Sequence, residues 1–156
     1  MTIEDDIDLL EQVPTLALLG RPALRILAIG AESRYVHRGE VLFHYGEQAD
    51  AGYVVQKGSF SLDAREADET GRELTVGPRT LIGELALLTE TMRPATATAL
   101  EPSTVVRISR SLFLKMLDGF PEAARRLRDH LAARSEQMTK EMRAIRKALD
   151  VSDRAR

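Results

Sequence analysis

Glycine recurs at short intervals through the middle of the chain, and the stretches between glycines are rich in β-branched and aromatic residues. These stretches include YVHRGEVLFHY, GYVVQKG, SFSLDAR, ELTV, ATATAL and TVVRIS. Many short strands separated by glycine turns are typical of small antiparallel sheets that close on themselves. We therefore predict a jelly-roll-like antiparallel β-roll over residues 33–109, with a hairpin tip at 67–71.

The segments on either side of this region have helical periodicity. Residues 1–32 carry apolar side chains at helical spacing, interrupted by Pro14 and by the turn at 20–22, which predicts two or three short helices. After residue 109, Ser109 or Ser111 can cap a short helix, and Pro121 suits the first turn of a long helix ending near residue 149. The chain length of 156 residues fits one α+β domain, divided into 1–32, 33–109 and 110–150.

The long helix also carries an imperfect heptad pattern. Its two apolar positions are occupied by Leu131, Met138 and Ile145, and by Ser135, Met142 and Leu149. Such a seam predicts that the helix packs on its own twin, so we expect a homodimer. The alternative is that the same stripe packs back on the roll.

Composition excludes several classes of function. Lys and Arg number 22 against 24 Asp and Glu, so net charge indicates no general affinity for nucleic acid or membranes. The acidic first twenty residues and the basic last thirty are interpreted as solvated helix faces. The chain has no cysteine, no signal-peptide pattern and no apolar run as long as a membrane span. We expect a cytoplasmic protein.

No catalytic or metal-binding constellation is visible. His37, His44 and His130 are scattered and do not stand at metal-ligand spacing with carboxylates. Neither a G-x-S-x-G nucleophile turn nor a phosphate loop of the G-x-x-x-x-G-K type occurs. We therefore expect neither an enzyme nor a metal or cofactor site.

Chemistry is concentrated in residues 81–99, LIGELALLTETMRPATATA. Gly83 can open a short helix whose first amides lack helical acceptors and therefore attract an anion. Glu84 beside this end would repel a phosphate unless its carboxylate accepts from sugar hydroxyls. Arg93 can fold back and bind the phosphate through two donors. The arrangement suits a ligand with a sugar edge and a phosphate; the alternative is that Glu84 and Arg93 simply pair across a turn.

These residues resemble the cyclic nucleotide-binding domain family. Its phosphate-binding cassette reads Gly-Glu-Leu-Ala-Leu-Leu, a loop, then Arg-x-Ala-Thr, and this chain has GELALL at 83–88 and RPAT at 93–96. RGEVLFHYGEQAD at 38–50 and YVVQKG at 53–58 match as well. The resemblance covers about 10–149 and implies helices, an eight-stranded β-roll, a hinge helix and a long C-terminal helix.

The resemblance also implies roles for individual residues of the cassette at 83–96. Glu84 would accept from the ribose 2′-hydroxyl, with the Gly83 amide close to it. Leu85 and Ala86 would offer backbone amides to the cyclic phosphate, and Arg93 would pair with its oxygens. Ala95 leads the chain into the next strand.

Pro94 departs from the family pattern. The family usually places Ala, Ser or Thr here and uses the backbone N–H for the phosphate, whereas proline has none. Losing a donor to a charged acceptor costs about 1.5–3 kcal/mol. Pro94 also lacks the hydroxyl that members favouring cyclic GMP tend to have, so cyclic AMP is the expected ligand and cyclic GMP the second choice.

The long helix resembles that of the catabolite-activator branch, where it forms the dimer interface and lends side chains to the base. Met138 and Thr139 occupy the matching positions, as an apolar lid and as a hydroxyl that can reach the adenine. In that branch a helix-turn-helix domain would follow, and here the sequence ends at Arg156. The resemblance therefore implies a sensor without a DNA-binding domain of its own.

Two functions are compatible with these residues. The first is a regulatory sensor that binds a cyclic nucleotide and transmits binding through its C-terminal helices to an unnamed protein partner. The second is a degenerate fold, without ligand, that serves as a dimerisation or docking module, and Pro94 is the residue that favours it. A DNA-binding transcription factor is a third, weaker hypothesis.

Overall fold

The computed structural model describes residues 2–64 and 73–154, except the side chains of 135–139, 141–142, 145–146 and 148–154. Three short helices come first: α1 (Ile3–Glu11), α2 (Pro14–Ala17) and α3 (Arg21–Gly30). Thr2 caps α1 through a reciprocal pair of hydrogen bonds with Asp5, and a proline stands in the first turn of both α2 and α3. The hairpin tip expected at 67–71 lies outside the described residues.

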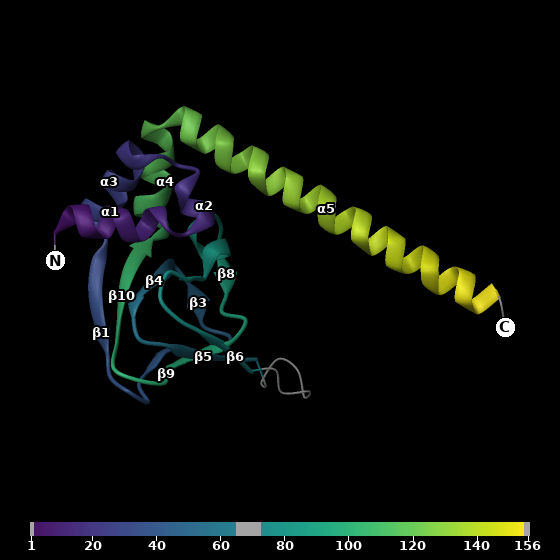
Figure 1. The fold of residues 1–156 in the computed structure, drawn as a ribbon, viewed down its shortest axis with the longest axis horizontal. Coiled ribbons are helices and arrows are strands. Elements are labelled where there is room, and N and C mark those ends of the chain that lie inside the picture. The colour runs from purple at the N-terminus through teal and green to yellow at the C-terminus, as the bar shows by residue number, and fades with distance from the viewer. Residues whose placement is uncertain (1, 65–72, 155–156) are drawn as a thin grey trace.

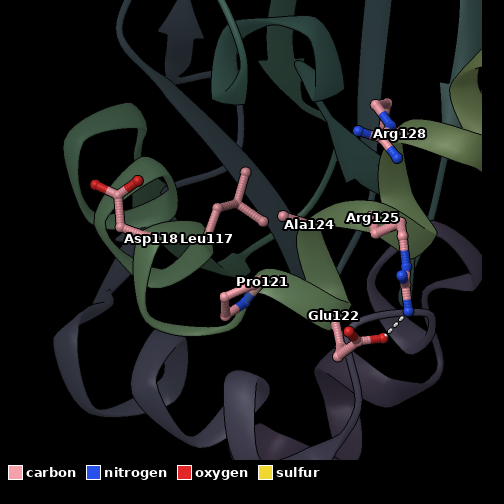
Figure 2. A pocket seen from close by; sticks show the side chains of 7 residues that line it. All are labelled: Leu117, Asp118, Pro121, Glu122, Ala124, Arg125 and Arg128. Atoms are coloured by element: carbon pink, nitrogen blue, oxygen red, sulfur yellow. Dashed lines mark hydrogen bonds and ion pairs between the residues drawn. The ribbon is translucent and has the colours of Figure 1, made fainter.

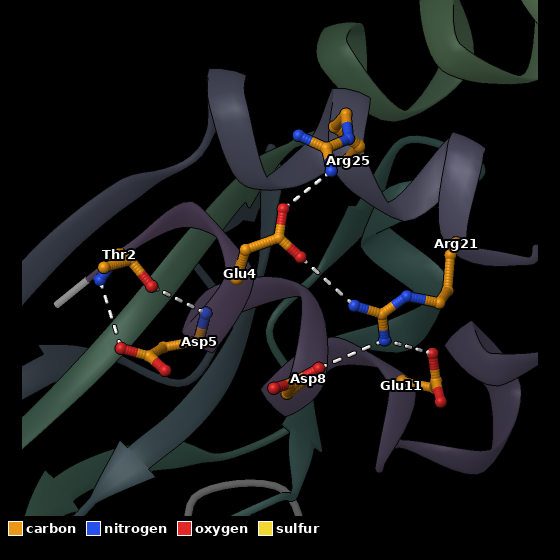
Figure 3. Close-up of polar contacts among 7 residues, drawn as sticks. All are labelled: Thr2, Glu4, Asp5, Asp8, Glu11, Arg21 and Arg25. Carbon is orange, nitrogen blue, oxygen red and sulfur yellow. Dashed lines mark hydrogen bonds and ion pairs between the residues drawn. The ribbon is translucent and has the colours of Figure 1, made fainter.

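The acidic residues of α1 face the basic residues of α3 (Figure 3). Arg21 contacts Glu4, Asp8 and Glu11 at 2.8–3.3 Å, and Arg25 contacts Glu4 at 2.6 Å. These side chains stay about half exposed, so solvent screens the ion pairs and each contributes little to stability. The acidic N-terminus is thus matched within the chain, while the apolar stripe beneath it holds the helices together.

The middle of the chain forms two four-stranded antiparallel sheets, with strand orders β1-β10-β4-β7 and β2-β9-β5-β6. A two-stranded pair, β3–β8, accompanies them among the described residues. This arrangement confirms the predicted α+β fold with an eight-stranded roll and adds the short pair. The strands are β1 (Glu32–Val36), β2 (Val41–Phe43), β3 (Gln48–Ala49), β4 (Ala51–Lys57), β5 (Phe60–Asp63), β6 (Glu73–Val76), β7 (Leu81–Ile82), β8 (Thr91–Met92), β9 (Thr96–Ala99) and β10 (Ser103–Ser109).

Two apolar clusters make up the core. One lies inside the roll and includes Phe43, Tyr53 and Phe60. The other joins the helices to β4 and β10 and contains Leu87 of the cassette together with Phe113. Because the cassette contributes to the second cluster, it is packed directly against the helical part of the molecule.

The chain leaves the roll through α4 (Arg110–Gly119) and turns sharply into α5 (Pro121–Arg154). Ser109 caps α4, as expected, by accepting from the Leu112 amide at 3.1 Å. α5 has 34 residues, and its C-terminal part extends away from the body of the molecule (Figure 1). No helix of the described part is long and apolar enough to cross a membrane.

The start of α5 is seated on the body, whereas its far end is not. Ala123 and Leu127 are buried, and Leu131 packs against the helical cluster. The position of Leu131 therefore agrees with the alternative prediction, in which the apolar stripe of the long helix packs back on the protein. The remaining seam residues (Ser135, Met138, Met142, Ile145 and Leu149) have side chains outside the described part.

Candidate functional site

The cassette begins with a glycine that no other residue could replace without strain. Gly83 follows β7 with φ +83°, in the left-handed region. A Cβ on it would lie 2.6 Å from Arg93 Nη1 and 3.3 Å from the Ala51 carbonyl oxygen. Both backbone conformation and space therefore require glycine here.

A single turn of 3₁₀ helix, η1 (Glu84–Leu87), follows this glycine. The Ala86 amide donates to the Gly83 carbonyl at 3.1 Å. The Glu84 and Leu85 amides have no backbone acceptor within the part of the chain that the structure describes. Free amides are thus found at the start of the turn, as expected, but the Ala86 amide that was predicted to bind phosphate is already engaged.

Arg93 is a buried cation, only 4% exposed. Its backbone is fixed on both sides, since its amide donates to the Glu47 carbonyl and its carbonyl accepts from the Gly46 amide. The guanidinium lies 4.2 Å from the Phe43 ring centroid and 5.5 Å from that of Tyr53. Nη2 donates to the Ala51 carbonyl at 2.9 Å, while the buried Nη1 has no hydrogen-bond partner.

The electrostatic environment of Arg93 leaves its charge uncompensated. Burial lowers the pKa of the guanidinium, and Tyr53, Asp50 and Glu47 raise it to a lesser extent. An arginine nevertheless stays protonated in proteins. No described carboxylate lies within ion-pair distance of it. A buried cation with a free N–H donor beside a glycine turn is a binding site for an anion, which would accept that hydrogen bond.

Glu84 does not pair with Arg93, so the alternative of a simple salt bridge across the turn is wrong. Its carboxylate instead lies 3.1 Å from Nη1 of Arg134 on α5, and the Glu84 side chain is 33% exposed. Arg93 turns inward onto Phe43 while Glu84 turns outward to the helix. Sequence reasoning missed Arg134, because the contact spans fifty residues and depends on the path of α5.

The other predicted site residues differ in how exposed they are to solvent. Leu85 is 59% exposed and Pro94 is exposed, whereas Ala86 is buried and Ala95 half-buried. The side chains of Met138 and Thr139 lie outside the described part, so their proposed contact with a base stays a prediction. Among the described residues, no His, Asp and Glu cluster is arranged to hold a metal ion.

Two of the hollows on the described surface lie at the α4–α5 junction and beside the cassette loop. One, of about 530 Å³, lies at the α4–α5 junction, where Leu117, Asp118 and the paired Glu122 and Arg125 line it (Figure 2). The other, of about 290 Å³, lies beside the cassette loop and is lined by Arg110, among others. Neither hollow is lined by Glu84 or Arg93, which separates both from the anion site.

Known proteins share this fold and this cassette region. The N-terminal domain of a transcriptional regulator from Streptomyces coelicolor is 32% identical, with a TM-score of 0.78, covering 86% of this chain and 95% of that one. A cyclic nucleotide-binding-like protein from Brucella abortus is 37% identical, with a TM-score of 0.65, covering 73% and 98%. An uncharacterized NTE family protein of Mycobacterium tuberculosis is 36% identical over 72% of this chain, which spans only 19% of that protein.

A family model for the cyclic nucleotide-binding domain matches residues 33–120, which contain the roll, the cassette and α4. The chain belongs to the cyclic nucleotide-binding domain family. This confirms the resemblance noted in the sequence and gives the uncompensated Arg93 a chemical context.

Gly83→Ala tests the packing of the cassette turn. The variant should lose more than about 1 kcal/mol of unfolding free energy, because the new methyl group meets Arg93 in a backbone conformation that alanine disfavours. Urea denaturation measures the change. Gly77→Ala is the matched control, since a Cβ there meets nothing within 4 Å, and equal losses in both variants would contradict the assignment.

Proposed function

We propose that this protein binds a cyclic nucleotide, with cyclic AMP preferred, and that binding regulates a protein partner through the C-terminal helices. The observation that carries the proposal is the Arg93 guanidinium, buried with an unpartnered Nη1 beside Gly83. The free amides of Glu84 and Leu85 begin the same turn. Together they provide donors and a positive charge for a phosphate, and no described carboxylate competes within ion-pair distance of Arg93.

The neighbouring carboxylate supports a sugar on one side of that phosphate. Glu84 is partly exposed and turned away from Arg93, so its oxygens can accept from ribose hydroxyls. In this proposal the Gly83 backbone amide lies close to the same ribose hydroxyl as Glu84. Met138 and Thr139 remain the candidates for contact with the base.

The same carboxylate offers a route to α5. Glu84 is held by Arg134, so a ribose that binds Glu84 must share or displace this contact. Either change alters the relative stability of α5 positions, and the ligand then shifts the population between them. In this proposal, signal transmission requires that the ligand binds with different affinity to the protein in its different α5 positions, and it requires no covalent reaction.

A docking module without ligand is the second candidate. Two observations favour it: Pro94 provides no N–H, and the Glu84 carboxylate is occupied by Arg134. This candidate predicts no nucleotide binding while keeping the same fold and helices, and the following experiments separate it from the first.

Arg93→Lys should weaken cyclic AMP binding at least about tenfold, because lysine keeps the charge but loses the planar pair of donors. Isothermal titration calorimetry of wild type and variant measures this. Arg107→Lys is the control, since Arg107 is an arginine of the roll that is paired with the Asp50 carboxylate, and this variant should bind almost as wild type does. Absence of heat from wild type at millimolar cyclic AMP would favour the docking module.

Pro94→Ala should strengthen cyclic AMP binding by about ten- to a hundredfold, because it restores one N–H donor to a charged acceptor. The same calorimetry measures the gain. The fold should be unaffected, since Pro94 is exposed. An unchanged dissociation constant would mean that position 94 does not donate to the phosphate in this protein.

The proposed homodimer through α5 predicts a species of twice the 17.3 kDa chain mass in sedimentation velocity, with or without nucleotide. Ile145→Lys should dissociate it, because a charge would enter the apolar seam. Ala144→Lys is the control one residue away on an exposed position. A protein that sediments as a monomer under all conditions would refute the predicted dimer through α5.

A further inference from the structure

Arg110 connects three separate parts of the molecule through one nitrogen atom. Its Nη1 donates to the Ala49 carbonyl at the end of β3 at 3.0 Å, to the Thr89 carbonyl at 3.1 Å and to the Ala86 carbonyl at 3.4 Å. Its own backbone amide donates to the Asp50 carbonyl at 2.8 Å. Arg110 is at the same time the first residue of α4.

Two of the three carbonyls that Arg110 holds, those of Ala86 and Thr89, belong to the cassette turn and the residues just after it. A helix end leaves its last carbonyls without intrahelical donors, and basic side chains commonly satisfy them. Ala86 lies in η1 and Thr89 comes two residues after its last residue, Leu87, so Arg110 closes the C-terminal end of this turn. The opposite end of the same turn presents the free amides beside Arg93.

The role of Arg110 is not charge neutralisation. Asp50 and Glu90 line the same hollow, yet no described carboxylate lies within ion-pair distance of the Arg110 guanidinium. Its identified partners are all main-chain carbonyls. A side chain with this set of partners fixes backbone positions relative to one another, and here it fixes η1 relative to the start of α4.

We propose that Arg110 is a positioning residue that tethers the cassette turn to α4 and transmits ligand-driven movement of that turn to α4. The transmission half rests on the proposed function; the tether does not. A ligand acts on the end of η1 next to Arg93, while Arg110 is hydrogen-bonded to the other end. Displacement of the turn therefore also displaces Arg110, the first residue of α4. The hydrogen bonds are directional, whereas the apolar contact of Leu87 with the helical cluster can slide.

The tether is tested without ligand by hydrogen–deuterium exchange of the full chain. Arg110→Met keeps the aliphatic stem but removes the donors, and amides of residues 86–92 should exchange about tenfold faster, as expected for loss of hydrogen bonds from a charged group. Arg110→Lys should recover part of the protection. Arg126→Met is the matched control, because Arg126 also donates to main-chain carbonyls, those of Leu18 and Leu19, neither of which belongs to the cassette.

Transmission is tested by distance measurement between spin labels at Ser33→Cys in β1 and Asp118→Cys at the end of α4. The chain has no native cysteine, so both labels are unique. Saturating cyclic AMP should shift the distance distribution in the labelled parent and in Arg110→Lys, but not in Arg110→Met, although calorimetry still detects binding by that variant.

Each outcome separates the two claims. Unchanged exchange of the amides of residues 86–92 in Arg110→Met would overturn the tether. A normal distance shift in Arg110→Met would overturn transmission through this residue. Absence of both heat and shift in the labelled parent would overturn the proposed function and transmission together, while the ligand-free exchange still decides the tether.

Discussion

The cassette is organised around one buried cation, the guanidinium of Arg93. Its desolvation is offset in part by the faces of Phe43 and Tyr53 and by the Ala51 carbonyl, which leaves Nη1 without an acceptor. Cation–π contacts contribute roughly 0.5–2 kcal/mol, less than the cost of an unpaired buried charge. The structure around Arg93 therefore favours an anion, and the absence of a side chain at Gly83 leaves room for the Arg93 guanidinium.

The cassette turn is restrained from both sides by basic residues of the C-terminal helices. Arg134 of α5 holds Glu84, and Arg110 of α4 holds the carbonyls at the other end. Leu87 joins the same turn to the helical core. A ligand at this turn would act on elements that already share contacts with both helices, which is why a small local displacement can have a distant effect.

Much of the fold could be predicted because it depends on local patterns. Glycine-separated β-rich stretches indicated the roll, and Ser109 and Pro121 marked the beginnings of α4 and α5, since capping and proline preferences act within a few residues. The cassette was located from Gly83 and Arg93. The Glu84–Arg134 pair was not, because an ion pair between a turn and a helix fifty residues later leaves no local signal.

The sequence by itself determined the succession of helical, β-rich and helical segments and the family, because these follow from periodicity, turn chemistry and an ordered motif. Only the tertiary structure decided which contacts the residues of the cassette make. It buries Arg93 under Gly83, turns Glu84 outward to Arg134, and brings Arg110 to the end of the same turn. These contacts depend on how α4 and α5 pass over the roll, which is set by packing of the whole core.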